Sequence, residues 1–207
     1  MSPLLSMSDL DNQAAQITEQ RPDQNVFELD LTLWNLLATL CRHAPSVARE
    51  QFSLPQSTVV ALAVTPSHEL SKLASGVVLS FQLHTPEPDV CDFLSAEYER
   101  AIPPGFAGME GVEREFDVTY WLTLRNLARR DAPMAATAFG VSHSLAKAVA
   151  EATDNQIRQL VTEICTACTL RFGPEIVEGL LPSANLRKRR QAFFMKYQQS
   201  LSVGGNV

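Results

Sequence analysis

The feature that most constrains this sequence is an internal repeat with an offset of 87 residues. The run from Asp30 to Leu37 aligns with the run from Asp117 to Leu124, so the chain's two tryptophans, Trp34 and Trp121, occupy equivalent positions. A regular offset of this kind indicates one supersecondary unit used twice. Further matches at the same offset are Thr32 with Thr119, Leu40 with Leu127, Phe52 with Phe139, Ala63 with Ala150 and Leu73 with Leu160.

Each repeat predicts a helical module. Apolar residues at helical spacing predict a first helix over about 31–43, ended by Pro45, and its counterpart over about 118–130. Shorter helices are expected to follow, with Thr65 and Thr153 as N-caps of the fourth. Partly alternating residues at 77–83 and 168–172 predict short β segments. The fold class is therefore mainly α, with two tandem modules.

Composition suggests where the modules begin and end. Residues 27–84 and 115–182 are expected to form repeats 1 and 2, and residues 1–26 a polar, disordered N-terminus. Residues 85–114 carry prolines, glycines and many carboxylates, which predicts an acidic linker with one short helix near Phe93 to Arg100. Residues 183–207 are expected to form a basic, amphipathic C-terminal segment.

Charge is distributed unevenly along the chain. The net charge is -6, but the segment from Asn185 onward has five basic residues and no acidic one, so the rest carries -11. An acidic body with one basic segment suggests local contact with a polyanion, although a solubilising helix end would have the same composition. Candidate contacts with phosphate are Arg187, Lys188, Arg189, Arg190 and Lys196.

The second repeat also contains a pattern typical of a helix-turn-helix. Ala136 is small enough for a helix crossing, Gly140 tolerates a left-handed turn, and Val141 and Leu145 begin an apolar stripe. The same pattern occurs in helical hairpins that never touch DNA. The second helix offers only His143, Ser144 and Lys147 to a nucleic acid, and the first repeat has Ser53 at the turn. Lys147 is its one candidate cation.

Four ungapped stretches of the second repeat give it a family resemblance. Residues 118–122, 131–149, 153–160 and 168–172, within the run from Glu115 to Phe172, resemble FlhD, a subunit of a bacterial flagellar master regulator. Residues 29–83 look like a more distant version. The resemblance implies a helical module that dimerises, joins a zinc-containing FlhC-type partner, binds promoter DNA and recruits RNA polymerase. Here the duplication would let one chain make the pairing that the family makes between subunits.

The expected function is therefore a DNA-binding activator subunit in a homo- or hetero-oligomer. FlhD-like and FlhC-like pairs also occur on mobile elements as activators of conjugation and excision, so both flagellar and conjugative-element control stay open. The alternative is an interaction module or anti-activator that occupies another regulator without contacting DNA. Trp34 and Trp121 are expected in the core or an interface, and Phe193 and Phe194 on a C-terminal helix that docks on the body or a partner. A membrane-surface helix is a third option, but the segment is short, so no membrane partner is expected.

The remaining chemistry favours no enzyme. Cys165 and Cys168 have the spacing of half a zinc site or a redox pair, but a zinc site needs two further ligands, so packing thiols are expected. The sequence has no phosphate loop, nucleophile elbow or zinc-protease motif. We therefore expect no metal and no cofactor. Without a long apolar run or an N-terminal signal pattern, a cytoplasmic location is expected.

Overall fold

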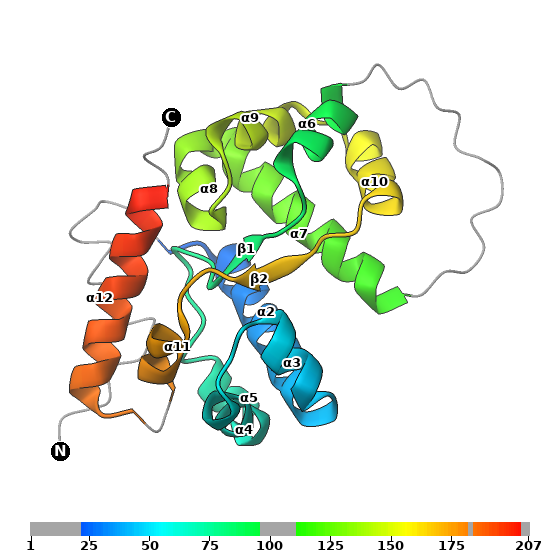
Figure 1. The fold of residues 1–207 in the computed structure, drawn as a ribbon. Coiled ribbons are helices and arrows are strands. Elements are labelled where there is room, and N and C mark those ends of the chain that lie inside the picture. Colours follow the sequence, from blue (N-terminus) through cyan, green and yellow to red (C-terminus); the bar gives the residue numbers. More distant parts are fainter. Residues whose placement is uncertain (1–21, 96–110, 182–183, 204–207) are drawn as a thin grey trace. The chain divides into compact units, whose positions relative to one another are not determined.

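The computed structural model describes residues 22–95, 111–181 and 184–203 (Figure 1). These residues are mostly helical, which confirms the mainly α fold class. The helices and strands, in chain order, are α2 (Gln24–His43), α3 (Pro45–Gln51), α4 (Gln56–Val64), α5 (Ser67–Leu70), β1 (Phe81–Leu83), α6 (Glu87–Ser95), α7 (Gly111–Arg130), α8 (Ala132–Phe139), α9 (His143–Glu151), α10 (Asp154–Glu163), β2 (Cys168–Leu170), α11 (Pro174–Leu180) and α12 (Leu186–Val203).

Local signals explain where several helices begin. α2 begins at Gln24 because the Asp23 side chain accepts hydrogen bonds from the N–H groups of Asn25 and Val26. This start lies inside the segment expected to be disordered, of which residues 1–21 are outside the described part. Thr153 and Gln156 form a reciprocal capping box at the start of α10. Among the described residues, no helix is both long and apolar enough to traverse a bilayer.

The helix bounds reproduce the offset found in the sequence. Adding 87 to the bounds of α2, α4 and β1 gives those of α7, α9 and β2, and adding it to the starts of α3, α5 and α6 gives those of α8, α10 and α11. The left-handed turn residues obey the same offset, since Ser53 has a φ of 51° and Gly140 a φ of 67°. Both β segments are shorter than expected, at three residues each.

The described chain divides into two compact units that do not follow the sequence order. Unit 1 contains residues up to 82, residues 137–140 and residues from 169 onward; unit 2 contains residues 83–136 and 141–168. β1 and β2 pair antiparallel, because Arg171 donates to the Ser80 carbonyl (3.0 Å) and His84 to the Ala167 carbonyl (2.7 Å). The chain leaves unit 1 within β1, returns to it briefly at residues 137–140, and re-enters it within β2.

Unit 1 is built on α2, which packs against α3, α4 and α5. Trp34 is buried there and meets Phe81 edge-on, with ring centroids 5.3 Å apart. The unit is completed by helices from the far end of the chain: α11 packs against α4, and α12 packs against α11. Thr58 of α4 donates a 2.9 Å hydrogen bond to Glu178 of α11.

Unit 2 is built on α7, which packs against α9 and α10. Trp121 is buried and donates a 2.9 Å hydrogen bond to the Thr166 hydroxyl. The helix that completes this unit is α6, which follows the first repeat in sequence but packs against α9 and α10. Gln156 of α10 donates to the Leu94 carbonyl of α6 over 3.1 Å. The segments after the two strands are thus exchanged: α6 completes the second repeat's helices and α11 completes the first's.

Candidate nucleic-acid interface

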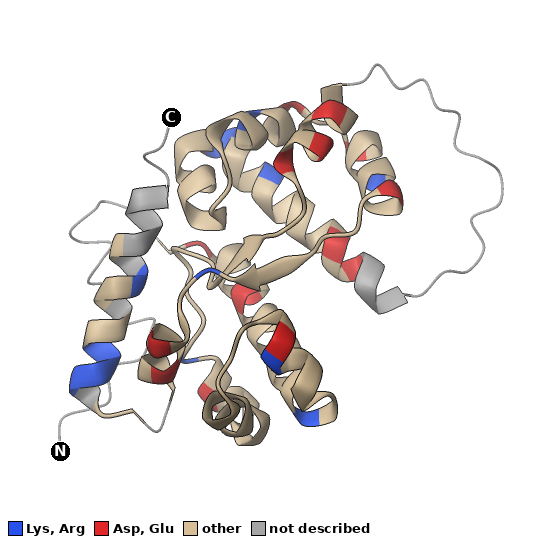
Figure 2. Ribbon diagram, in the orientation of Figure 1, with Lys and Arg blue, Asp and Glu red and all other residues tan. Residues whose placement is uncertain are grey.

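The basic segment lies at the start of α12 (Figure 2). The Asn185 side chain accepts a 2.9 Å hydrogen bond from the Lys188 N–H, which fixes the helix start immediately before the cations. Arg187, Lys188 and Arg190 are exposed, whereas Arg189 is half-buried and donates to the Leu181 carbonyl over 3.3 Å. Three of the four cations therefore extend into solvent from one helical turn.

Close packing holds this helix against α11. Gly179 of α11 and Ala192 of α12 are both buried where the two helices cross. A Cβ placed on Gly179 would come within 2.7 Å of the Ala192 Cβ, which is closer than real Cβ contacts. Only glycine therefore fits at this crossing, and the basic turn is presented by a packed helix.

A buried polar cluster provides the second attachment of α12. Lys196 is only 2% exposed; its ammonium donates to the Ser80 hydroxyl over 2.8 Å and lies 3.8 Å from the Asp30 carboxylate. Asp30 accepts from the Ser80 N–H (2.6 Å), the Ser80 hydroxyl (2.9 Å) and the Ser75 N–H (3.0 Å). Trp34 completes the cluster, donating from its indole to the Ser80 hydroxyl over 3.0 Å.

Desolvation governs the charge state of this cluster. Burial raises the pKa of the Asp30 carboxyl above its ordinary value of 3.8, while Lys196 and the hydrogen bonds from Ser80 and Ser75 oppose the rise. The Ser80 hydroxyl accepts from two donors and gives its proton to Asp30, so its hydrogen-bonding capacity is fully used. The cluster is therefore a satisfied network inside unit 1.

The structure places Lys196 differently from its four basic neighbours in sequence. The sequence grouped it with the DNA contacts, but its ammonium faces Asp30 and Ser80 in the core of unit 1. Lys196 therefore positions α12, and the exposed candidates for contact with phosphate on this helix are the cations at its start. Sequence periodicity could not reveal this, because the partners precede Lys196 by more than a hundred residues.

The aromatic residues expected at an interface differ in their burial. Trp34 and Trp121 are buried in the cores of units 1 and 2, which is the packing alternative for both. Phe194 is 55% exposed on α12. The side chain of Phe193 lies outside the described part of the structure.

The second candidate surface is the α8–α9 hairpin, whose turn residue is Gly140. The Ser142 side chain accepts from the Leu145 N–H and caps α9, and Lys147 is exposed on that helix. Both carboxylate oxygens of Glu87, from α6, lie 3.1 Å from the Ser142 N–H. A helix N-terminus attracts phosphate through such N–H groups. In this chain a carboxylate already occupies that place, a contact that the sequence did not reveal.

The two cysteines of the pair differ, since Cys165 is exposed and only Cys168 has the properties of a packed thiol. Burial, with Asp117 and Cys165 nearby, raises the pKa of Cys168 to about 12, so its thiol stays protonated at physiological pH. The thiolate is the form that attacks disulfides or binds zinc, and this shift disfavours it. Within the described ranges, no three His, Cys, Asp or Glu side chains are grouped as a metal site would require.

Comparison with known proteins gives one match. Residues 112–200, which run from α7 into α12 and make up less than half of the chain, match the family model described as flagellar transcriptional activator (FlhD). Neither the curated proteins nor the solved structures gave a match. The matched family consists of transcriptional regulators, which supports a regulatory role and gives no support to catalysis. The segment from α7 to α12 is therefore FlhD-like.

Proposed function

We propose that this chain is a DNA-binding subunit of a transcriptional activator that works with an FlhC-like partner in the cytoplasm. The observation that carries the proposal is the FlhD match over residues 112–200, which includes the exposed cations at the start of α12. Because α12 is held by the Gly179 crossing and the Lys196–Asp30 pair, those cations have a fixed scaffold. Phosphate contacts of this kind supply affinity and orientation, and the partner would supply sequence recognition.

We also propose that the chain contains two tandem FlhD-like modules. The common offset of the helix starts, strand bounds and turn residues supports this reading. The exchange of α6 and α11 is what a two-fold dimer with swapped ends would give after fusion of its subunits. One chain would then supply the pairing that FlhD makes between subunits. This function is compatible with flagellar promoters and with conjugative-element promoters. It is also compatible with recruitment of RNA polymerase.

DNA binding by the purified complex tests the proposal. The chain is co-purified with the FlhC-like protein encoded nearest to it, and affinity for the adjacent promoter is measured across a salt series. Each lost phosphate contact flattens the plot of log affinity against log salt by about 0.9. The variant with alanine at Arg187, Lys188 and Arg190 should therefore reduce the slope by about 2 to 3. The matched control is Arg42→Ala with Arg49→Ala, since both side chains are exposed on unit 1 away from α12.

A second function is favoured by the acidic surroundings of α9. Glu87 at the start of that helix disfavours phosphate there, and no basic residue occurs in α4. An anti-activator would bind a regulator without gaining promoter affinity. If the triple variant and the Arg42/Arg49 control have the same salt slope, or the complex has no DNA affinity, the activator proposal is wrong and the interaction module takes its place.

A further inference from the structure

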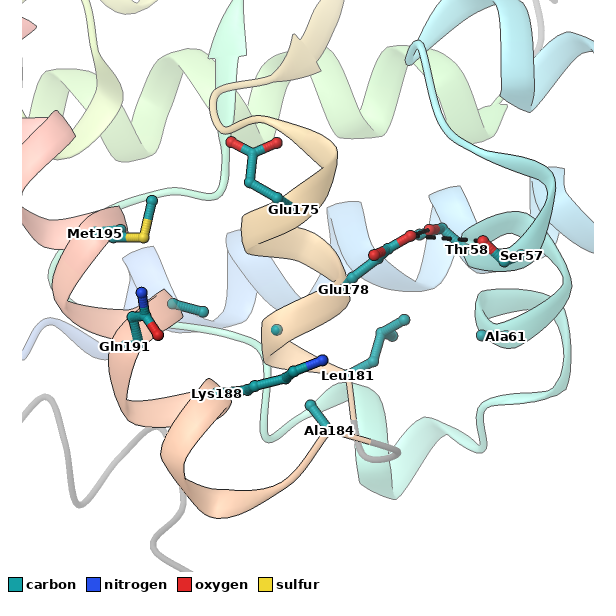
Figure 3. Close-up of a pocket in the computed structure, with 12 residues that line it drawn as sticks. Ser57, Thr58, Ala61, Glu175, Glu178, Leu181, Ala184, Lys188, Gln191 and Met195 are labelled. Atoms are coloured by element: carbon teal, nitrogen blue, oxygen red, sulfur yellow. Dashed lines mark hydrogen bonds between the residues drawn. The ribbon is translucent and has the colours of Figure 1, made fainter.

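A groove in unit 1 lies between α4, α11 and α12 and encloses about 590 Å³ (Figure 3). Its apolar lining comes from all three helices and the loop that joins the last two. Leu181 and Ala192 are buried at its base. The other apolar lining residues are Ala61, Gly179, Ala184 and Met195.

One wall of the groove is acidic. Glu175 and Glu178 lie three residues apart on α11, so their side chains share a face of that helix, and both are exposed. Glu178 is directed across the groove to Thr58, whose hydroxyl donates to it over 2.9 Å. Among the described lining residues, Lys188 is the one cation against two carboxylates, which gives this part of the groove an excess of negative charge.

On α4, which lines the groove with Ser57, Thr58 and Ala61, two valines are exposed beside the lining. Val60 and Val64 are 54% and 75% exposed, and their spacing places them beside Ser57 and Ala61 on the helix surface. Single exposed valines are common on proteins, but these two lie on a helix that forms one side of the groove. The residues 87 positions later, on α9, are Lys147 and Glu151, both exposed. The first repeat therefore has an apolar edge where the second has charges.

We propose that this groove binds an amphipathic helix of a partner protein, with an apolar face flanked by Lys or Arg. The apolar lining and the two valines suit the anchors that a docked helix presents at positions i, i+4 and i+7. Glu175 and Glu178 would pair with the basic flank, as electrostatic complementarity requires. Residues 1–21 of this chain fit poorly, because they carry three acidic residues and one basic residue. The proposal does not depend on DNA binding by α12.

Peptide binding to the full-length protein tests this docking site. The probe is a labelled helical peptide of about 16 residues, with leucines at i, i+4 and i+7 and lysines beside them. Its counterpart has glutamates in place of the lysines. Fluorescence anisotropy should give saturable, micromolar binding of the lysine peptide. Ala61→Trp, which fills the groove, and Glu175→Lys, which reverses its charge, should each weaken that binding at least tenfold.

Matched variants on the second repeat are the controls. Ala148→Trp and Glu151→Lys lie on α9 and should leave the affinity unchanged. Val64→Asp changes a largely exposed side chain, so it should weaken binding without unfolding the protein. Equal affinity of Ala61→Trp and the unsubstituted protein overturns the proposal, as does equal binding of the two peptides. Self-association that Ala61→Trp abolishes also overturns it, because the occupant is then a second copy of the chain.

Discussion

At the scale of single residues, the ionisation of Asp30 is set by its burial and by Lys196. Because burial raises the pKa of Asp30 above 3.8, the folded protein binds its proton more tightly than the unfolded chain does. The carboxyl's contribution to the free energy of unfolding is therefore fully present below about pH 4 and is lost as pH rises through the folded-state pKa. Lys196 limits that loss by stabilising the ionised form.

Lys196→Met should lower the free energy of unfolding by about 3–5 kcal/mol at neutral pH, because it leaves a buried carboxylate without its cation. The penalty should shrink as the pH is lowered, since protonated Asp30 needs no cation. Urea unfolding at several pH values measures both effects. Lys147→Met, at an exposed position of α9, is the control and should change stability by less than about 0.5 kcal/mol. A penalty that does not vary with pH would contradict the role assigned to Asp30.

Exchanging the residue types at Ser53 and Gly140 tests the conformation of the two turns. Both are left-handed, a conformation that costs a non-glycine residue about 1–2 kcal/mol. Gly140→Ser should destabilise by about that amount, and further because a Cβ there would lie 3.0 Å from the Arg171 guanidinium. Ser53→Gly should stabilise by up to about 1 kcal/mol. Thermal unfolding of the two variants measures both changes in stability. If both variants are stabilised, or both destabilised, the role assigned to the left-handed turns is wrong.

At the scale of helices and strands, local sequence predicted most of what is seen. The spacing of leucines and tryptophans located α2 and α7, although each begins seven residues before the expected start. The short helix expected near Phe93 to Arg100 overlaps α6 only at residues 93–95, and residues 96–100 lie outside the described part; α6 begins earlier, with Pro88 in its first turn, where proline is favoured. Such features depend on neighbours in the chain, so the sequence alone is enough to indicate them.

The destinations of α6 and α11 could not be predicted in this way. Their amphipathic patterns show that each buries one face, but Val90 and Ile176 do not encode which core receives them. The contacts that decide this lie far away in sequence: Glu87 meets Ser142 and Glu178 meets Thr58. The same limit applies to the candidate site, where the basic run was visible and the burial of Lys196 was not.

Substitutions in the exchanged helices should act on the opposite repeat. Val90→Asp in α6 places a charge in the core of unit 2, so amide hydrogen exchange should accelerate in α9 and α10 and stay unchanged in α4. Ile176→Asp in α11 should accelerate exchange in α4 and spare α9. Hydrogen exchange followed by mass spectrometry measures both. If Val90→Asp accelerates hydrogen exchange in α4 instead, α6 packs with the first repeat and the swapped arrangement of α6 and α11 is wrong.

At the scale of the whole molecule, each unit contains residues from both sides of segment 96–110. A protease site inserted there would cut the chain into two fragments, and neither fragment contains all of unit 1 or all of unit 2. The cut protein should therefore elute as one species of about the original size under native conditions and separate only in denaturant. Size-exclusion chromatography before and after cleavage measures this. Fragments that separate in native buffer would rule out the exchanged arrangement.

The swapped positions of α6 and α11 also set an order of events during synthesis. Unit 2 is complete in sequence once β2 begins to emerge from the ribosome, whereas α2, α3 and α4 must wait for α11 and α12, which are made later. The first repeat is therefore made before the second but completed after it, and Asp30 meets its cation only after Lys196 leaves the exit tunnel. Until then the apolar faces of the first repeat are open to other surfaces, as expected for slow, non-local contacts. A nascent chain truncated before α11 should accordingly engage chaperones through its N-terminal half.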